Sequence, residues 1–234
     1  MPEPFRYVAL IAAAGIGTRL GADGPKQYLR LGARTMLEHS IAALLLDARI
    51  ERVFVVVAPA DVQWSSLRLA SQRVEFLAVG GASRAESVRN GLRAIAVRTH
   101  ADDRVLVHDA ARPCLGATEL ARLLDQVGNH PAGGLLAMPV TDTLKRGDGG
   151  QVVATLQREG LWYAQTPQVF RIGSLLAALE RESINGVTDE AGAIEAAGDS
   201  PMLVRGSATN IKITSAEDLT LACAILAARH EAPQ

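Results

Sequence analysis

An uninterrupted apolar run near the start of the chain most constrains what this sequence can fold into. Residues Tyr7–Ala14 are hydrophobic and end in three alanines. A continuous run of this kind is typical of a strand buried on both faces of a parallel sheet. It leads directly into Gly15 and Gly17, and then to Arg19 and Lys26. Because glycine has no Cβ, this loop lets backbone N–H groups close on an anion, and the two cations would add fixed positive charge. The pattern predicts a phosphate-binding loop after the first strand.

The loop differs from the two commoner phosphate-binding loops. The dinucleotide fingerprint G-x-G-x-x-G needs its third glycine where this chain has Leu20, and Gly21 comes one position late. The P-loop needs Gly-Lys-Ser/Thr after four spacer residues, and no such tripeptide follows. A dehydrogenase is therefore disfavoured, and an absence of nicotinamide binding would exclude it.

Apolar strands alternate with helical patterns over the first part of the chain. This alternation predicts an α/β fold, a Rossmann-like and mostly parallel sheet with helices on both faces. Ligands bind such sheets outside the carboxyl ends of the strands, where the loops 13–26, 80–87 and 108–113 should open. The expected strands are Tyr7–Ala13, Arg52–Val57, Val74–Val79, Arg104–Val107 and Gly134–Met138, and the expected helices are Thr35–Asp47, Val62–Ser71, Arg84–Val97 and Ala117–Val127.

The alternation ends at Thr141. From there to Phe170 the chain is polar, with a turn at Gly147–Gly150, which predicts a hairpin projecting from the sheet. Because a lone hairpin is marginally stable in water, we expect this β-arm, at about residues 141–165, to pack on a second subunit. We expect one domain over residues 1–234, which ends with helices near Ile172–Glu182 and Asp189–Ala197, a strand near Pro201–Val204 and a helix from Ser215 to about Arg229.

The charge and cysteine content exclude several classes of partner. The net charge of −1 argues against a general nucleic-acid or membrane-surface role. The two cysteines, Cys114 and Cys223, are too few for a disulfide framework and fit a reducing cytoplasm. Met1–Pro4 lacks the basic start of a signal peptide, and no apolar run reaches about 18 residues. We therefore expect a cytoplasmic protein that binds small molecules, with no nucleic-acid and no membrane partner.

Asp109 is a candidate metal ligand. It follows the apolar strand Val105–Val107, within the segment His108–Pro113. A carboxylate beside bound phosphates would be repelled unless a cation lay between them, and Mg²⁺ accepts one or two carboxylates plus phosphate oxygens. The alternative is that Asp109 caps a turn or helix, with Arg112 as its ion-pair partner. We expect His108 to be a packed, hydrogen-bonded residue rather than a general base.

Two further segments carry chemistry. Gly80 and Gly81 would bring backbone close to a flat ligand such as a base, and Ser87 offers a hydroxyl from the following helix. The alternative is an ordinary strand–turn–helix junction. Lys212 lies in a short apolar stretch before the last helix, from which it could reach phosphate oxygens. The alternative for Lys212 is a strand-edge lysine that guards against aggregation.

These motifs occur in one order across nearly the whole chain, from about Val8 to Leu221. Together they resemble the 2-C-methyl-D-erythritol 4-phosphate cytidylyltransferases of the non-mevalonate isoprenoid pathway. The first motif alone indicates only the wider sugar-nucleotidyltransferase group. The H-D-A-A-R-P and T-P-Q motifs narrow the resemblance to this family. In chain order the motifs are A-A-A-G-I-G-T-R-L…P-K-Q-Y, G-G-A-S-R-A-E-S-V, H-D-A-A-R-P, L-W-Y-A-Q-T-P-Q, V-T-D-E and N-I-K-I-T.

The resemblance implies that CTP and methylerythritol phosphate give the CDP-alcohol and pyrophosphate, by in-line attack on the α-phosphate. It implies that Arg19, Lys26 and Lys212 are catalytic and that Asp109 binds Mg²⁺ or another divalent cation. It further implies a homodimer in which each arm reaches the neighbour's polyol-phosphate site. The implied nucleotide-binding residues are Ala13, Ala14, Gly15, Gly81, Ala82, Arg84 and Ser87, and the implied substrate-binding residues are Asp109, Arg112, Thr143, Arg158, Thr166 and Thr188.

Two departures and two alternatives accompany the resemblance. Relatives often have proline where Ala12 stands and an acidic residue where Ala82 stands, so a ribose contact in relatives could be missing here. One alternative is a cytidylyltransferase for another polyol phosphate such as ribitol 5-phosphate. The other is a non-catalytic nucleotide-sensing module, which has no need for transition-state charges such as Arg19 and Lys26.

Overall fold

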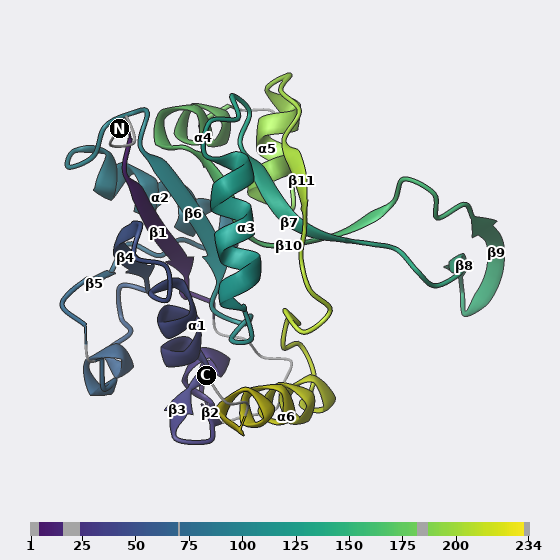
Figure 1. The fold of residues 1–234 in the computed structure, drawn as a ribbon, viewed down its shortest axis with the longest axis horizontal. Helices are drawn as coiled ribbons and strands as arrows, with labels where there is room; N and C mark the ends of the chain where they lie inside the picture. The colour runs from purple at the N-terminus through teal and green to yellow at the C-terminus, as the bar shows by residue number, and fades with distance from the viewer. Residues whose placement is uncertain (1–4, 16–23, 70, 182–186, 232–234) are drawn as a thin grey trace.

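A seven-stranded sheet forms the centre of the molecule, with the strand order β11-β7-β10-β6-β1-β4-β5 (Figure 1). The computed structural model describes residues 5–15, 24–69, 71–181 and 187–231. β1 pairs in parallel with both β4 and β6, and β10 runs antiparallel between β6 and β7. The predicted mostly parallel α/β sheet is thus confirmed. The strands are β1 (Tyr7–Ala12), β4 (Ile50–Val56), β5 (Val74–Leu77), β6 (Arg104–Asp109), β7 (Gly134–Pro139), β10 (Trp162–Arg171) and β11 (Met202–Arg205).

Helices cover both faces of this sheet. Successive residues of a strand point to opposite faces, and β1 feeds two separate cores in this way. Ala9 and Ile11 pack in the core of α1 and α3, whereas Val8 and Leu10 pack in the core of α2, α4 and α5. The helices are α1 (Met36–Leu44), α2 (Arg84–Ala96), α3 (Ala117–Val127), α4 (Ile172–Leu179), α5 (Glu190–Ala196) and α6 (Ala216–Glu231).

A third, smaller core lies under α6. This helix packs near the short β2–β3 hairpin (Arg30–Leu31 and Arg34–Thr35) through a cluster that includes Met36 and Ile213. Ser215 and Asp218 bond to each other's backbone N–H at 3.2 and 2.9 Å, which is the capping box expected for α6. Within the described residues, no helix combines the length and hydrophobicity needed to cross a bilayer.

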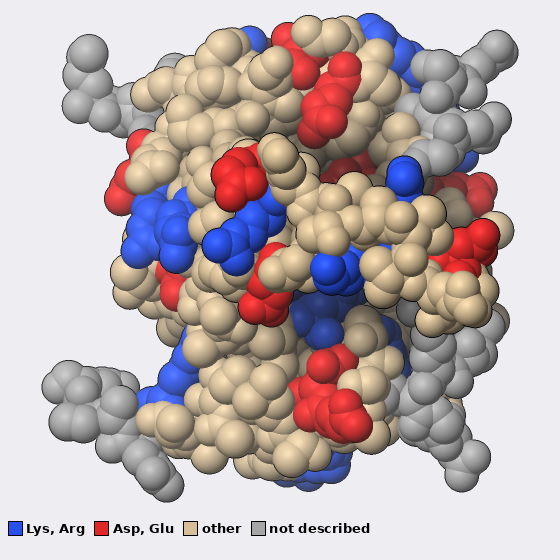
Figure 2. All heavy atoms as spheres, turned by 90° about the vertical axis from the view of Figure 1, so that its right-hand side faces the viewer, with Lys and Arg blue, Asp and Glu red and all other residues tan. Residues whose placement is uncertain are grey.

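The arm projects far from the sheet (Figure 1). Its tip is an antiparallel pair, β8 (Leu144–Asp148) and β9 (Gln151–Leu156), which confirms the predicted projecting β-arm. Several large apolar side chains on it face solvent within one chain, among them Val152 at 66% exposure and Val153 at 57%. Acidic and basic residues are interspersed on the face that carries the arm (Figure 2).

The helix predicted at Val62–Ser71 is wrong. Only a short 3-10 turn, η3 (Gln63–Ser66), is present, and Leu67 after it is extended. The hydroxyls of Ser65 and Ser66 donate to carbonyls three residues earlier, at 2.8 and 2.7 Å, and such bonds compete with a helix.

The hairpin predicted to run through Phe170 is also too long. Residues 162–171 belong to β10, in the middle of the main sheet, where Gln168 pairs with Val107 and with Leu135. The polar residues in this stretch suggest an exposed segment in the sequence. In the fold, however, their side chains are buried and hydrogen-bonded. Gln165, Thr166 and Gln168 are all at most 7% exposed.

Candidate active site

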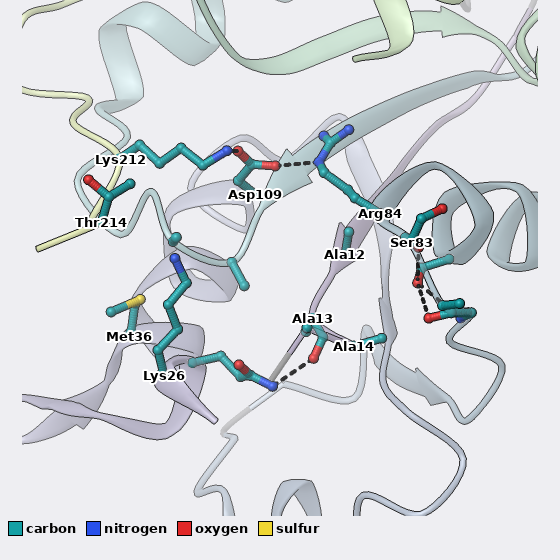
Figure 3. A pocket seen from close by; sticks show the side chains of 17 residues that line it. Ala12, Ala13, Ala14, Lys26, Met36, Ser83, Arg84, Asp109, Lys212 and Thr214 are labelled. Atoms are coloured by element: carbon teal, nitrogen blue, oxygen red, sulfur yellow. Dashed lines mark hydrogen bonds and ion pairs between the residues drawn. The ribbon is translucent and has the colours of Figure 1, made fainter. Parts of the chain in front are cut away.

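A cleft of about 730 Å³ opens at the carboxyl ends of β1 and β6, within the size range of small-molecule sites. Figure 3 shows side chains from distant parts of the chain converging on it. Its residues come from the loop after β1, the turn before α2, the end of β6 and the segment before α6. The lining residues are Ala12, Ala13, Ala14, Gly15, Lys26, Gln27, Met36, Gly81, Ala82, Ser83, Arg84, Ser87, Asp109, Ala110, Ala111, Lys212 and Thr214.

The loop after β1 is fixed at both ends of its described part. Ala13 N–H donates to the Val56 carbonyl at 2.8 Å, and the buried Gln27 amide donates to the Ala13 carbonyl at 2.7 Å. Lys26 begins the short turn η2 (Lys26–Tyr28), and its ammonium group donates to the Ile213 carbonyl at 2.9 Å. Lys26 thus stands in the cleft, as predicted, whereas Arg19 lies outside the described residues.

The turn before α2 forms the opposite wall. A Cβ at Gly80 would collide with the Ala14 side chain and with the Val57 carbonyl oxygen at 2.8 Å, so only glycine lets the two loops approach this closely. The Ser87 hydroxyl accepts from Gly81 N–H at 3.0 Å and donates to the Ser83 carbonyl at 2.8 Å. Ser87 therefore shapes the turn that carries the predicted nucleotide contacts of Gly81 and Ala82.

Asp109 lies between two cations at the end of β6 (Figure 3). Its Oδ1 accepts from Arg84 Nε and its Oδ2 from Lys212 Nζ, both at 2.8 Å. Burial disfavours the charged carboxylate, but Arg84 and Lys212 outweigh burial and hold the pKa of Asp109 well below its usual range. The sequence alternative of an Arg112 partner is weaker, because Arg112 Nε lies 4.0 Å from Oδ2.

Behind Arg84 lies an acid that the sequence reasoning missed. Glu190, the first residue of α5, is 1% exposed and binds Arg84 through both carboxylate oxygens, at 2.7 and 3.0 Å. Burial works against the charge on Arg84, but Glu190 and Asp109 prevail and raise the pKa of Arg84. The available signal was a second acid directly after Asp189, which itself caps α5 by accepting from Gly192 N–H at 3.0 Å.

His108 is a packed residue, as expected. Its Nδ1 bonds with the Thr166 hydroxyl at 2.9 Å and its Nε2 with the Arg112 carbonyl at 3.2 Å. Burial lowers the pKa of His108 to about 4, so the ring is neutral near pH 7. The same Thr166 hydroxyl accepts from Asp109 N–H at 3.0 Å, so within one chain it is committed to holding the end of β6.

Besides Thr166, four of the predicted substrate-binding residues lie outside the cleft lining. Arg112 donates to the carbonyls of Asn210 and Ala164, at 2.6 and 3.2 Å. Thr188 is exposed just before α5. Thr143 and Arg158 are exposed on the arm, where Arg158 bonds to the Thr141 carbonyl. A single chain therefore brings the nucleotide and metal candidates together but leaves the arm candidates apart from them.

Comparison with known proteins identifies the family of the chain. The family model described as 2-C-methyl-D-erythritol 4-phosphate cytidylyltransferase matches residues 7–228. The chain belongs to this family. It is 54% identical to the cytidylyltransferase of that name from Dechloromonas aromatica (strain RCB), over 96% of this chain and 99% of the relative. It is also 54% identical to that from Laribacter hongkongensis (strain HLHK9), over 94% and 96% of the two chains.

Solved structures of the family have the same fold. A crystal structure of a 4-diphosphocytidyl-2C-methyl-D-erythritol synthase aligns with a TM-score of 0.85 at 42% identity, covering 95% of this chain and 98% of that one. The cytidylyltransferase from Francisella tularensis aligns with a TM-score of 0.82 at 35% identity, covering 94% and 99%. The family resemblance of the sequence is thus confirmed. The chain is a nucleotidyltransferase that transfers a cytidylyl group from CTP to 2-C-methyl-D-erythritol 4-phosphate.

Proposed function

We propose that this transfer takes place in the cleft at the carboxyl ends of β1 and β6. The observation that carries the proposal is the convergence of Lys26, Lys212 and Asp109 on one cleft, opposite the glycine turn before α2 (Figure 3). In this proposal the backbone at Ala13–Gly15 and at Gly81–Ala82 holds the nucleotide, as glycine-rich loops hold flat and anionic ligands.

The reaction needs charge stabilisation more than acid–base chemistry. An oxygen of the acceptor phosphate attacks the α-phosphorus of CTP in line, and the bond from that phosphorus to the departing pyrophosphate breaks. A phosphate monoester has a second pKa near about 6, so its attacking oxygen needs no base at neutral pH. Phosphoryl transfer relies on positioning and on positive charge at the equatorial oxygens. We assign this role to Lys26 and Lys212, and to Arg19 from the sequence motif.

Asp109 is the proposed ligand of a divalent cation. The part of the chain described by the structure holds no cluster of three or more His, Cys, Asp or Glu side chains suited to a metal ion. A single carboxylate nevertheless fits Mg²⁺, which takes one or two carboxylates together with substrate phosphates and waters. Each carboxylate oxygen of Asp109 accepts one bond from a cation and keeps a second lone pair. When bound, the ion would neutralise phosphate charge.

The acceptor site is proposed to form between two subunits. Thr143 and Arg158 lie on the arm, remote in sequence and place from the cleft of their own chain. The arm also exposes apolar side chains such as Val152 and Val153, which a second copy would cover. In a homodimer with exchanged arms, Arg158 would grip the acceptor phosphate with two parallel hydrogen bonds, near Thr166 and Thr188.

A pyrophosphate-release assay tests the reaction. With CTP and Mg²⁺, methylerythritol phosphate should give rapid release, and ribitol 5-phosphate should give far less. Equal turnover of the two alcohols would overturn the proposed acceptor choice, and no release with either would favour a nucleotide-sensing module. We also propose a cytoplasmic location, which the two unpaired cysteines, Cys114 and Cys223, support.

A further inference from the structure

Glu190 determines which N–H groups of Arg84 remain free to bond to other residues. Its two oxygens accept from Nη1 and Nη2 of Arg84, so this contact occupies one whole edge of the guanidinium group. Arginine and carboxylate groups frequently pair through two parallel hydrogen bonds of this kind, which fix the geometry of the pair. With that edge filled, Nε is the donor that faces Asp109, at 2.8 Å.

The anchored guanidinium group in turn fixes one oxygen of Asp109. Because Glu190 holds both Nη atoms of Arg84, the Nε–H group is aimed at Asp109 Oδ1. Asp109 Oδ2 accepts from Lys212, on the cleft side. Glu190 therefore affects the cleft without lining it.

Glu190 is itself held from the centre of the sheet. Gln168, in β10 and 1% exposed, hydrogen-bonds to the residues on either side of Glu190. The Gln168 amide nitrogen donates to Asp189 Oδ2 at 2.8 Å, and its oxygen accepts from Ala191 N–H at 2.8 Å. The T-P-Q and V-T-D-E motifs of the sequence meet in this contact, and the chain of bonds runs from β10 through α5 and α2 to the end of β6.

We propose that Glu190 is a positioning residue for the cytidylyl transfer, which acts through Arg84 to aim the Asp109 carboxylate into the cleft. This inference rests on the proposed role of Asp109. Burial raises the pKa of Glu190, and the pairing with Arg84 opposes that effect. The arrangement thus places a buried acid one side chain behind the reacting groups.

The first test compares two Glu-to-Gln changes on the same helix. Glu190→Gln keeps the size of the side chain but removes the charge and one acceptor. Because misplacement of a catalytic group by about 1 Å costs about 10²-fold, we expect kcat to fall by 10- to 100-fold. The Michaelis constants for CTP and for the alcohol phosphate should change far less. Glu195→Gln, at an exposed position of α5, is the matched control and should retain the wild-type kcat.

The second test is a double-mutant cycle, which separates positioning from a general loss of structure. If Glu190 acts through Asp109, the pair Glu190→Gln with Asp109→Asn should be about as slow as Asp109→Asn alone, because coupled residues are not additive. Losses in kcat that multiply would overturn the proposal. A normal kcat in Asp109→Asn would instead refute the proposed role of Asp109, so the two failures are distinguishable.

A third variant keeps the proposal testable if Glu190→Gln does not fold. Arg84→Lys retains the positive charge, but an ammonium group cannot make two parallel bonds to Glu190 and still donate to Asp109 from a second edge. Its kcat should fall to a similar extent, and Glu190→Asp, which preserves the charge, should recover part of the loss. A folded Arg84→Lys protein with the wild-type kcat would overturn the inference.

Discussion

Lys26 and Lys212 reach the cleft from different directions, and each is tied to a different kind of partner. Lys26 bonds to a backbone carbonyl at 2.9 Å, and Lys212 bonds to the Asp109 carboxylate at 2.8 Å. At the scale of single residues, both ammonium groups line the cleft, where positive charge would stabilise the α-phosphate.

We expect Lys26→Ala to reduce kcat by roughly 10²–10³ while weakening CTP binding much less, as removal of one preorganised donor typically does. Arg19→Ala should behave alike. Steady-state kinetics at saturating CTP, beside calorimetric CTP binding, measure the two effects. Arg34→Ala, which removes an exposed cation from β3, is the control. Near-normal turnover with weak binding would make either residue a ground-state binder.

Asp109→Asn should change the metal requirement. An amide is a poorer ligand for Mg²⁺ than a carboxylate, so the Mg²⁺ concentration for half-maximal activity should rise and the maximal rate should fall. Titrating Mg²⁺ against the wild type, the variant and Asp102→Asn, an exposed acid before β6, makes the comparison. An unchanged Mg²⁺ dependence would remove Asp109 from the metal site.

The two thiols should differ in reactivity. Burial raises the pKa of Cys114 to about 11, whereas Cys223 is exposed. Only the thiolate attacks, and at pH 8 roughly 10⁻³ of a thiol with this pKa is ionised. A disulfide reagent should therefore modify one thiol in the native protein and both after denaturation. Modification of Cys114 should quicken as pH rises. Two equally fast native reactions would contradict the buried placement.

Sequence reasoning located residues of the site that directly follow a strand. Asp109 ends β6, and Arg84 begins α2 after the turn that follows β5, so parallel topology alone brings them to one edge. Glu190 and Gln168 were missed because their roles depend on packing across the chain. Glu190 lies 106 residues from Arg84, and nothing local to either residue specifies their pairing.

At the scale of elements, substitutions on the arm test the proposed recognition of the acceptor. Arg158→Lys or Arg158→Ala should raise the Michaelis constant for the alcohol phosphate and leave that for CTP nearly unchanged, because lysine cannot make two parallel bonds to a phosphate. Arg146→Ala, an exposed change in β8 on the same arm, is the control. A matching rise in both Michaelis constants would show that Arg158 is not confined to the acceptor.

The elements differ in how well the sequence predicts them. α1 is found at its expected start because Thr35 and Glu38 form a local capping box. At Val62–Ser71 the predicted helix is replaced by η3, in which Trp64 stacks on Phe76 with ring centroids 4.8 Å apart, and the chain is extended at Leu67. The prediction of β10 fails for a different reason. Its polar residues are typical of an exposed hairpin, and the strands and helix that pair with them, β6, β7 and α5, are distant in the sequence.

At the scale of the whole molecule, mixed dimers test the exchange of arms. Arg158→Ala and Lys26→Ala chains should each be poorly active alone. If the arm acts in trans, a mixed dimer has one site with both defects and one with neither. Random pairing of equal amounts should then restore about a quarter of the wild-type activity. No recovery, once subunit exchange is verified by mass spectrometry, would mean that each arm serves its own chain.

The base of the arm is closed by the sheet itself. Trp162 pairs with Pro139 across β7 and β10, and Val140 N–H donates to the Leu161 carbonyl at 3.0 Å. A segment of any length inserted beyond that pair begins and ends at one place. Over evolutionary time, insertions and substitutions can therefore accumulate between residues 141 and 160 without disturbing the sheet that presents Asp109. The arm residues proposed for acceptor recognition, Thr143 and Arg158, therefore lie in a stretch that can vary separately from the strand that presents Asp109.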